Sequence, residues 1–215
     1  MTQEELKEAL RLHALWLEDP NQGKRANLRN ADLRCANLRN VDLRGADLRN
    51  ADLRCADLRG ADLRNAVLRN ATLRNADLRF ADLRGADLRD ANLQEADLRN
   101  ATLRDANLQG ADLSYANLRD ADLRGAVLRY IHLRATIGNM REVKSLQFED
   151  HPITYTASDL QIGCERHPIK RWWAMDDSTI DDMDYGALDW WRKWKEPLRQ
   201  MIELSPATPT EGENR

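Results

Sequence analysis

The chain has 215 residues, with 33 basic and 36 acidic residues and a formal net charge of −3, which points to no particular class of partner. Its three cysteines do not form a disulfide framework, as is typical of a reducing compartment. No apolar run approaches the roughly 18 residues of a membrane span, and the N-terminus carries charges where a signal peptide needs an apolar core. We therefore expect a cytoplasmic protein of one or two domains, with no membrane partner.

Residues 1–25 are predicted to form a capping helix followed by a turn. Thr2 and Glu5 have the spacing of a capping box, in which each side chain pairs with the backbone of the other residue. Apolar side chains recur at helical intervals at Leu6, Leu10, Ala14 and Leu17. The turn residues 19–23 end the helix. We expect it to cover the open end of the region that follows, because an uncovered backbone edge invites aggregation.

The next region, 26–135, repeats every five residues. Leu recurs from Leu28 to Leu133 in 22 repeats, and in 20 of them Ala stands two residues earlier, with Val41 and Ile131 as the exceptions. On an α-helix a step of five residues moves each Leu about 140° around the axis, so no apolar stripe forms. On a flat strand an odd step puts successive Leu on opposite faces. The period therefore excludes both a long helix and a long flat strand.

Each repeat has the pattern of a very short strand followed by a corner. Ala and Leu are two residues apart with a polar residue between them, which indicates a three-residue strand. The last position is Asn, Gly or Asp in 15 of the 22 repeats, and these residues favour the positive φ of tight turns. Four repeats then close a square coil of 20 residues. Coils stacked about 4.8 Å apart pair as parallel strands do, with Ala and Leu filling the axis.

The pattern of a small residue, then Asp or Asn, then Leu, then two variable residues resembles the pentapeptide-repeat family. The resemblance covers 26–135 and implies a mainly β fold, the right-handed quadrilateral β-helix. The best-studied members protect or inhibit DNA gyrase as dimers that mimic DNA, so the resemblance also implies that role as a candidate. The repeats here are more uniform than is usual in the family, and idealisation by design is an open explanation.

The outer surface of the predicted coil carries both signs of charge. Arg follows Leu in 19 repeats and Asp precedes it in 12, so ladders of Arg run beside ladders of Asp and Asn. The formal net charge is −1 over 1–25, +3 over 26–135 and −5 over 136–215. Because neighbouring carboxylates offset the repulsion between stacked guanidinium groups, we expect a solvated and mutually neutralised surface. An Arg track for nucleic acid is less favoured, since the Asp side chains would also face the phosphates.

The regular surface is interrupted late in the repeats. Arg is replaced there by Gln or Ser, and an acidic and an aromatic residue occupy corner positions. A partner protein cannot distinguish one position of a uniform ladder from the next, so we expect recognition where the ladder is interrupted. The candidate binding patch on the coil, called the break patch below, consists of Gln94, Glu95, Gln109, Ser114 and Tyr115. Sequence drift on a solvated face explains the same pattern.

After Ala135 the five-residue register is lost, and 136–204 are predicted to form a small α+β domain on the last coil. Short strands separated by turns are predicted at 145–148, 153–156 and 160–164. Asp177 and Ser178 can cap a short helix, and a longer amphipathic helix follows from Ala187, with Pro197 expected to bend or break it. The polar segment 205–215 is predicted to be a disordered tail.

Five of the six Trp residues lie between Trp172 and Trp194. We expect most of them to form the core of the C-terminal domain. A surface for a partner protein, or for a second copy of the chain, is the alternative, and the candidate interface consists of Trp173, Trp191 and Trp194. Gyrase-binding members of the family often dimerise through their C-terminal end, and the C-terminal region here departs from theirs because it is much longer and mixed.

No catalytic or metal site is predicted. Cys164 and His167 have C-x-x-H spacing, but one pair without a second is a weak zinc signal, and a Cys/His nucleophile pair also needs a cleft and an orienting group. The sequence has no Gly-rich phosphate loop and no catalytic-serine motif. Cys35 and Cys55, 20 residues apart, are expected to stack as two thiols. We therefore expect a protein that is not an enzyme and uses no cofactor or metal.

These patterns favour a non-enzymatic scaffold that binds an unidentified protein through a face of the coil or through its Trp-rich end. A DNA mimic acting on gyrase or another DNA-binding protein ranks second, because a mimic needs dense negative charge and the coil carries +3. Direct nucleic-acid binding ranks last.

Overall fold

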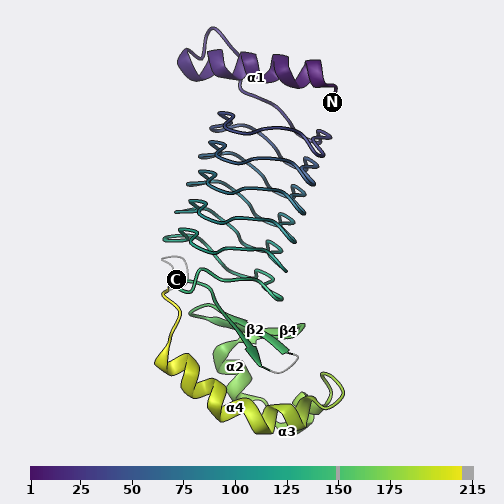
Figure 1. The fold of residues 1–215 in the computed structure, drawn as a ribbon, viewed down its shortest axis with the longest axis vertical. Coiled ribbons are helices and arrows are strands. Elements are labelled where there is room, and N and C mark those ends of the chain that lie inside the picture. Colours follow the sequence, from purple (N-terminus) through teal and green to yellow (C-terminus); the bar gives the residue numbers. More distant parts are fainter. Residues whose placement is uncertain (149–150, 210–215) are drawn as a thin grey trace.

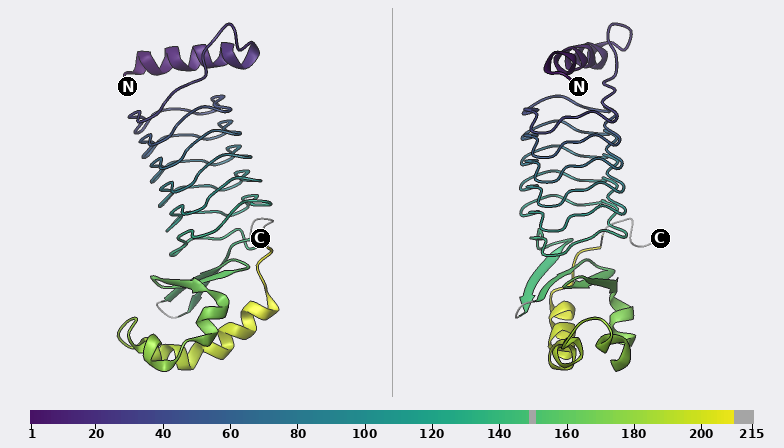
Figure 2. Two further views of the ribbon diagram at one scale, coloured as in Figure 1. Left: turned by 180° about the vertical axis from the view of Figure 1, so that it is seen from behind. Right: turned by 90° about the vertical axis from the view of Figure 1, so that its right-hand side faces the viewer.

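The computed structural model describes residues 1–148 and 151–209 and shows an elongated molecule (Figure 1). Helix α1 (Gln3–Glu18) lies across one end of a stack of coils, and a small sheet with three helices lies at the other end. The views from behind and from the side show the same stacking (Figure 2). The long axis of the molecule is therefore built from the repeats, and the two irregular parts of the chain lie at its ends.

Each repeat pairs with the repeat four places later in the chain. Parallel bridges join residues 20 apart, from Asn27 with Asp47 through Asn117 with Ile137. Between successive coils the Leu backbone N–H donates to a carbonyl, as from Leu68 to Asp87 at 2.7 Å. One coil therefore contains four repeats, as the period predicts. The pairing extends two residues past the predicted boundary at 135.

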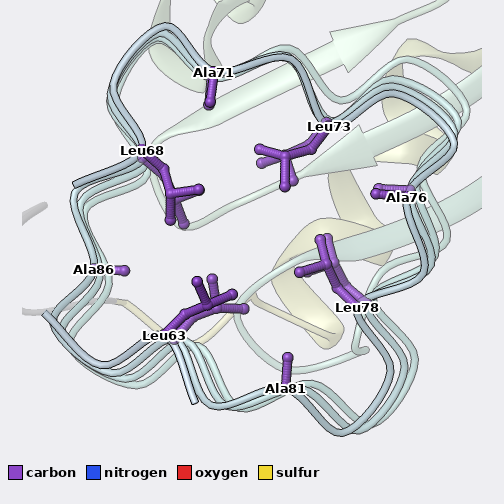
Figure 3. Packing of buried hydrophobic residues seen from close by; sticks show 14 of the residues in the cluster. Leu63, Leu68, Ala71, Leu73, Ala76, Leu78, Ala81 and Ala86 are labelled. Atoms are coloured by element: carbon purple, nitrogen blue, oxygen red, sulfur yellow. The ribbon is translucent and has the colours of Figure 1, made fainter. Parts of the chain in front are cut away.

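The Leu and Ala side chains point into the coil. Figure 3 shows Leu63, Leu68, Leu73 and Leu78 meeting across the axis, with Ala side chains between them. Every Leu of the 22 repeats is at most 2% exposed. Full burial of one such side chain stabilises the fold by roughly 1.5–3 kcal/mol, so the Leu columns supply most of the apolar driving force.

The last residue of every repeat turns a corner in the left-handed backbone region. From Asn30 to Ala135 the φ angles at these positions lie between 52° and 72°. That region costs least for Gly and is tolerated by Asn and Asp, which explains why these residues dominate the position. Phe80, Tyr115 and Tyr130 adopt the same conformation and remain half or more exposed.

Helix α1 covers the first coil, as predicted. Its capping box is formed, with Glu5 N–H donating to Thr2 Oγ1 at 3.2 Å and Thr2 N–H donating to Glu5 Oε2 at 2.7 Å. His13 of this helix, which sequence reasoning did not single out, is fully buried. Its Nδ1 accepts a hydrogen bond from the backbone N–H of Ala26 at 3.1 Å. Further apolar contact with the first coil comes from Leu6, Ala9 and Leu10.

The C-terminal part is α+β, as predicted, with one strand more than expected. An antiparallel sheet in the order β1-β2-β3-β4 is followed by three helices. The bounds are β1 (Lys144–Phe148), β2 (His151–Tyr155), β3 (Asp159–Ile162), β4 (Glu165–Pro168), α2 (Ile169–Ala174), α3 (Asp177–Asp181) and α4 (Ala187–Leu204). The sequence did not predict β4, because this edge strand is polar and ends in Pro. None of the described helices is long and apolar enough to cross a bilayer.

Two helix predictions need correction. The N-cap of α3 is Asp176, one residue earlier than predicted, and its Oδ1 accepts from the backbone N–H of Thr179 at 2.8 Å. Pro197 was expected to bend or break the last helix, and α4 continues through it without a break. The following turn is held in the core by Leu198 and Ile202, and this packing offsets the backbone hydrogen bond that Pro cannot make.

The predicted disordered tail, 205–215, is wrong for its first residues. The backbone N–H of Thr208 donates to Arg141 O at 2.8 Å, and Ala207 is buried in the C-terminal core. Tyr155 Oη also donates to Ser205 O at 2.7 Å. A polar composition did not reveal these contacts, because they depend on residues distant in sequence. Residues 210–215 lie outside the described part of the chain.

Two side chains of the sheet pair with backbone groups of the last coil. Inside the stack each Leu N–H donates to the next coil, but Leu133 has no further coil to pair with. Its N–H donates instead to Gln161 Oε1 at 2.8 Å, and both groups are buried. Arg166 Nη1 donates to Ile131 O at 2.6 Å in the same way. Side chains from β3 and β4 therefore replace the backbone that a further coil would supply.

Candidate interaction surfaces

On the coil surface, an Asp that precedes Leu pairs with the Arg that follows the same Leu. In one such repeat Arg49 Nε donates to Asp47 Oδ1 at 2.8 Å, and the backbone N–H of Arg49 donates to the same oxygen. The same pairing is made by Asp32, Asp42, Asp52, Asp57, Asp62, Asp77, Asp82, Asp87, Asp97 and Asp122. Eleven of the twelve Asp residues at this position are therefore ion-paired within their own repeat.

Ion pairs also join successive coils along one face. Asp77 Oδ2 lies 3.4 Å from Arg59 Nε, and Asp97 Oδ2 lies 3.6 Å from Arg79 Nε. Each of these carboxylates thus contacts one Arg of its own coil and one of the preceding coil. The hydrogen bond from the Arg59 side chain, supported by its backbone N–H, lowers the pKa of Asp57 to about 2. The ladders are therefore locally neutralised, as the sequence predicted.

The break patch gathers on adjacent coils, and several of its polar groups have partners within the chain. Ser114 leaves Asp112 without its usual Arg, and Gln94 Nε2 from the preceding coil donates to Asp112 Oδ2 at 2.5 Å instead. Ser114 itself is buried. The interruption is thus compensated inside the coil by one of the two N–H donors of the Gln94 side chain.

The remaining break-patch residues differ in their exposure and in the partners they already have within the chain. Glu95 Oε1 accepts from Arg74 Nη2 at 2.7 Å. Tyr115 is 50% exposed, and the Arg134 guanidinium lies 5.7 Å from the centre of its ring. Gln109 lies on the neighbouring face and is exposed, with its backbone N–H donating to Asn107 Oδ1 at 3.1 Å. Gln109, Tyr115 and Glu95 are thus exposed, and the Glu95 carboxylate is already paired with Arg74.

The Trp cluster is mainly the core of the C-terminal domain. Trp172 and Trp191 are each 3% exposed, and Trp172 Nε1 donates to Leu160 O at 2.7 Å. Trp191 therefore lies in the core, although the sequence placed it in the candidate interface. Trp173 stacks on Trp191 with ring centres 5.6 Å apart. Trp173 and Trp194 are both half-buried, so part of the cluster reaches the surface.

A cavity of about 60 Å³ opens between the sheet and the helices of this domain. Its walls include Trp172, Trp190 and Trp191, together with His151, Glu165 and Asp184. Two buried nitrogen atoms among its lining residues, His151 Nδ1 and Trp190 Nε1, have no hydrogen-bond partner within the described chain. Sequence reasoning missed this site because β2, β4 and α4 bring its residues together from positions far apart in the chain.

The three cysteines are free and exposed in the structure. Cys164 is exposed in the turn between β3 and β4, and the His167 Nε2 atom lies 3.5 Å from Glu165 Oε2. Burial lowers the pKa of His167. No three His, Cys, Asp or Glu residues of the described ranges gather as metal ligands. Cys35 and Cys55 are exposed free thiols at corners of the coil.

The chain shares its repeat with known proteins. A family model described as Pentapeptide repeats matches residues 24–60, 51–90 and 91–129. The solved structure of the pentapeptide repeat protein Rfr23 from the cyanobacterium Cyanothece 51142 is 40% identical to the chain, with a TM-score of 0.42. That alignment covers 43% of this chain and 63% of Rfr23, so the chain spans less than two thirds of Rfr23.

Two further structures are similar. A pentapeptide repeat protein of the Arabidopsis thaliana thylakoid lumen is 36% identical, with a TM-score of 0.46, over 47% of this chain and 70% of that protein. QnrB1, a plasmid-mediated fluoroquinolone resistance protein, is 26% identical over 57% of this chain and 64% of its own, with a TM-score of 0.51. No curated protein matches the chain. By its repeats and by these similarities, the chain belongs to the pentapeptide-repeat family.

Proposed function

We propose that the protein is a non-enzymatic interaction scaffold, in which the coil is a rigid support and the C-terminal domain binds a partner protein. The observation that carries this proposal is the uneven distribution of unpaired polar groups. On the coil, eleven Asp–Arg pairs and the Gln94–Asp112 hydrogen bond give every Asp that precedes Leu a partner, and Arg69 Nε is the one buried polar side-chain atom of the described coil residues without a partner. In the C-terminal domain, His151 and Trp190 line an open cavity with unpaired nitrogen atoms.

The proposal is tested by affinity capture from the native host with three matched proteins. The first is the wild type, and the second carries Gln94→Arg, Gln109→Arg and Ser114→Arg, which restores the regular coil surface. The third carries Trp190→Phe, which keeps an aromatic ring but removes the indole N–H. We expect the same specific partner with the wild type and the coil variant, and reduced capture with Trp190→Phe. Loss of the partner only with the coil variant would place recognition on the break patch.

We infer further that the repeats wind as the right-handed quadrilateral β-helix of the family. Support comes from the pairing of residues 20 apart and from the four Leu side chains that meet across one coil (Figure 3). A homodimer through the C-terminal domain and a cytoplasmic location are also part of the proposal. Light scattering coupled to size exclusion gives the oligomeric state, and fractionation of the native host gives the location.

A DNA mimic that acts on gyrase is the second candidate function. The similarity to QnrB1, a fluoroquinolone resistance protein, favours it. The charge of the coil opposes it, because a mimic needs unpaired negative groups and most Asp side chains here contact Arg. A gyrase supercoiling assay, with and without a fluoroquinolone, tests this candidate. Protection or inhibition at stoichiometric protein would favour the mimic over the scaffold.

A further inference from the structure

The aromatic cavity of the C-terminal domain has the electrostatic character of a cation site. Trp172, Trp190 and Trp191 contribute their rings to its walls. The faces of Trp rings attract ammonium groups, with the largest effect where water is excluded. The same cluster already shows this preference, because Lys195 Nζ lies 5.4 Å from the Trp191 ring centre and Lys193 Nζ lies 5.1 Å from that of Trp194.

The charged residues that line the cavity are acidic. Glu165 and Asp184 line it, and no Lys or Arg belongs to the described residues of its lining. The Tyr185 backbone N–H donates to Asp184 Oδ1 at 2.8 Å, which holds that carboxylate in place. An adjoining hollow shares Asp184 and adds Asp181 and Asp189. Four carboxylates therefore lie in the cavity wall or in the adjoining hollow, which complements a positively charged partner.

The two unpaired nitrogen atoms restrict further which ligand groups the cavity can bind. The rings of His151 and Trp190 lie 4.9 Å apart, centre to centre, and both unpaired atoms are buried in these neighbouring rings, so a ligand reaches them when the rings turn. A neutral imidazole with its proton on Nε2 presents Nδ1 as an acceptor, whereas an indole Nε1–H can only donate. A ligand that pairs both atoms must therefore bring a donor and an acceptor. The ammonium of a lysine side chain and a peptide carbonyl supply that combination.

We propose that this cavity binds a lysine side chain of a basic peptide segment in the partner protein. The ammonium lies against the Trp rings and donates to His151 Nδ1, while Glu165 and Asp184 balance its charge. The Trp190 indole N–H donates to a carbonyl of the same segment. About 60 Å³ is several times the roughly 10–15 Å³ that a single water needs, so a chain terminus of a few heavy atoms fits. This inference rests on the proposed function, since it names the chemistry of the partner.

The test is an NMR titration of the full-length ¹⁵N-labelled protein with the peptide acetyl-Gly-Lys-Gly-amide. The indole N–H signal of Trp190, assigned by its loss in Trp190→Phe, should shift and saturate. The peptide with norleucine in place of lysine keeps the apolar stem without the charge, and should bind about tenfold more weakly. Trimethyl-lysine has no ammonium N–H to donate to His151, so its peptide should also bind more weakly than the lysine peptide.

Two charge variants complete the test. Glu165→Gln with Asp184→Asn should weaken lysine-peptide binding, while Asp105→Asn with Asp120→Asn removes the same charge from distant coil corners and should not. Dispersed spectra confirm that each variant is folded. Equal binding of the norleucine peptide would overturn the proposal, as would an unmoved Trp190 signal at the highest peptide concentration. In either case, partner capture that still depends on Trp190 would leave the scaffold function standing without the lysine site.

Discussion

His13 ties the N-terminal helix to the first coil through one buried ring. Its Nδ1 accepts from Ala26 N–H, and the ring stacks on Trp16 with centres 5.5 Å apart. Burial lowers its pKa from the ordinary value of 6.5. A protonated ring cannot accept the Ala26 hydrogen bond, so the contact exists only with the neutral form.

The first residue-scale prediction follows from that pKa. Between pH 6.5 and the lower pKa of the folded state, the unfolded chain takes up a proton that the folded chain does not. Acidification in this window therefore favours unfolding, and the stabilisation is fully present only above pH 6.5. His13→Asn keeps an acceptor without a titrating ring, so its melting temperature should fall less than that of the wild type between pH 7.5 and 5. His167 titrates in both proteins and cancels in the comparison. If the melting temperatures of the wild type and His13→Asn fell equally with pH, the result would contradict this role of His13.

A second residue-scale prediction concerns the axis of the coil. Leu83 is 0% exposed and lies mid-stack among other Leu side chains. Leu83→Lys buries an unpaired ammonium, at a cost of several kcal/mol, where no water can reach it. We expect no soluble folded protein, measured by soluble expression and circular dichroism. Arg84→Lys, on the outside of the same repeat, is the matched control and should be soluble. A folded Leu83→Lys variant would rule out the inward orientation of Leu.

At the scale of elements, each end of the stack is covered by a part of the chain outside the repeats. At the C-terminal end, Gln161 from β3 and Arg166 from β4 pair with the backbone of the last coil. Arg166 is also placed by Asp159, whose Oδ1 lies 3.3 Å from its Nη2. The sheet therefore acts as a cap whose side chains imitate the missing next coil.

Gln161→Met is the element-scale test of this cap. Met has a similar size but leaves the buried Leu133 N–H unpaired, which should destabilise the junction by about 1–3 kcal/mol. Hydrogen exchange of the Leu133 amide, together with the melting temperature, measures the effect. Gln200→Met on the exposed surface of α4 makes the same chemical change away from the coil and should be neutral. Unchanged protection of Leu133 would show that Gln161 is not its essential partner.

The other end is tested by deletion of residues 1–20. The repeats should stay paired, but the first coil would expose unpaired backbone groups and the apolar surface that Leu6 and Leu10 cover. Oligomers or aggregates should therefore appear in size-exclusion chromatography with light scattering. A strictly monomeric truncation with an unchanged far-ultraviolet spectrum would argue against the capping role of α1.

Sequence reasoning succeeded where one signal repeats and failed where contacts join distant residues. Leu every five residues and Asn or Gly at the corners predicted the coil, since each repeat reports the same local geometry. The pairing of Gln161 with Leu133 spans 28 positions, and neither residue has a distinctive neighbour. The cavity likewise joins His151 to Trp190. The role of such residues depends on contacts between distant segments of the chain, so composition and periodicity do not reveal it.

At the scale of the whole molecule, charge pairing decides what the coil can bind. The face that carries Arg59, Arg79 and Arg99 alternates with Asp along the stack, so each guanidinium has a carboxylate within reach. A phosphate backbone would meet both signs there. Exposed ion pairs contribute little stability individually, so removing several carboxylates should change the surface much more than the fold.

The last prediction uses this difference to test nucleic-acid binding by gain of function. Asp57→Asn, Asp77→Asn and Asp97→Asn change the formal charge of 26–135 from +3 to +6 and leave a column of unpaired Arg on one face. In a gel-shift assay with duplex DNA, the wild type should give no retarded complex at moderate salt. The triple variant should bind at low salt, and its affinity should fall steeply as salt rises, because each phosphate contact releases counterions.

The control variant, Asp32→Asn with Asp105→Asn and Asp122→Asn, removes the same charge from other faces and controls for net charge alone. Strong binding by the wild type at moderate salt would mean that the Asp ladders do not screen the Arg side chains, and direct nucleic-acid binding would then replace the scaffold proposal.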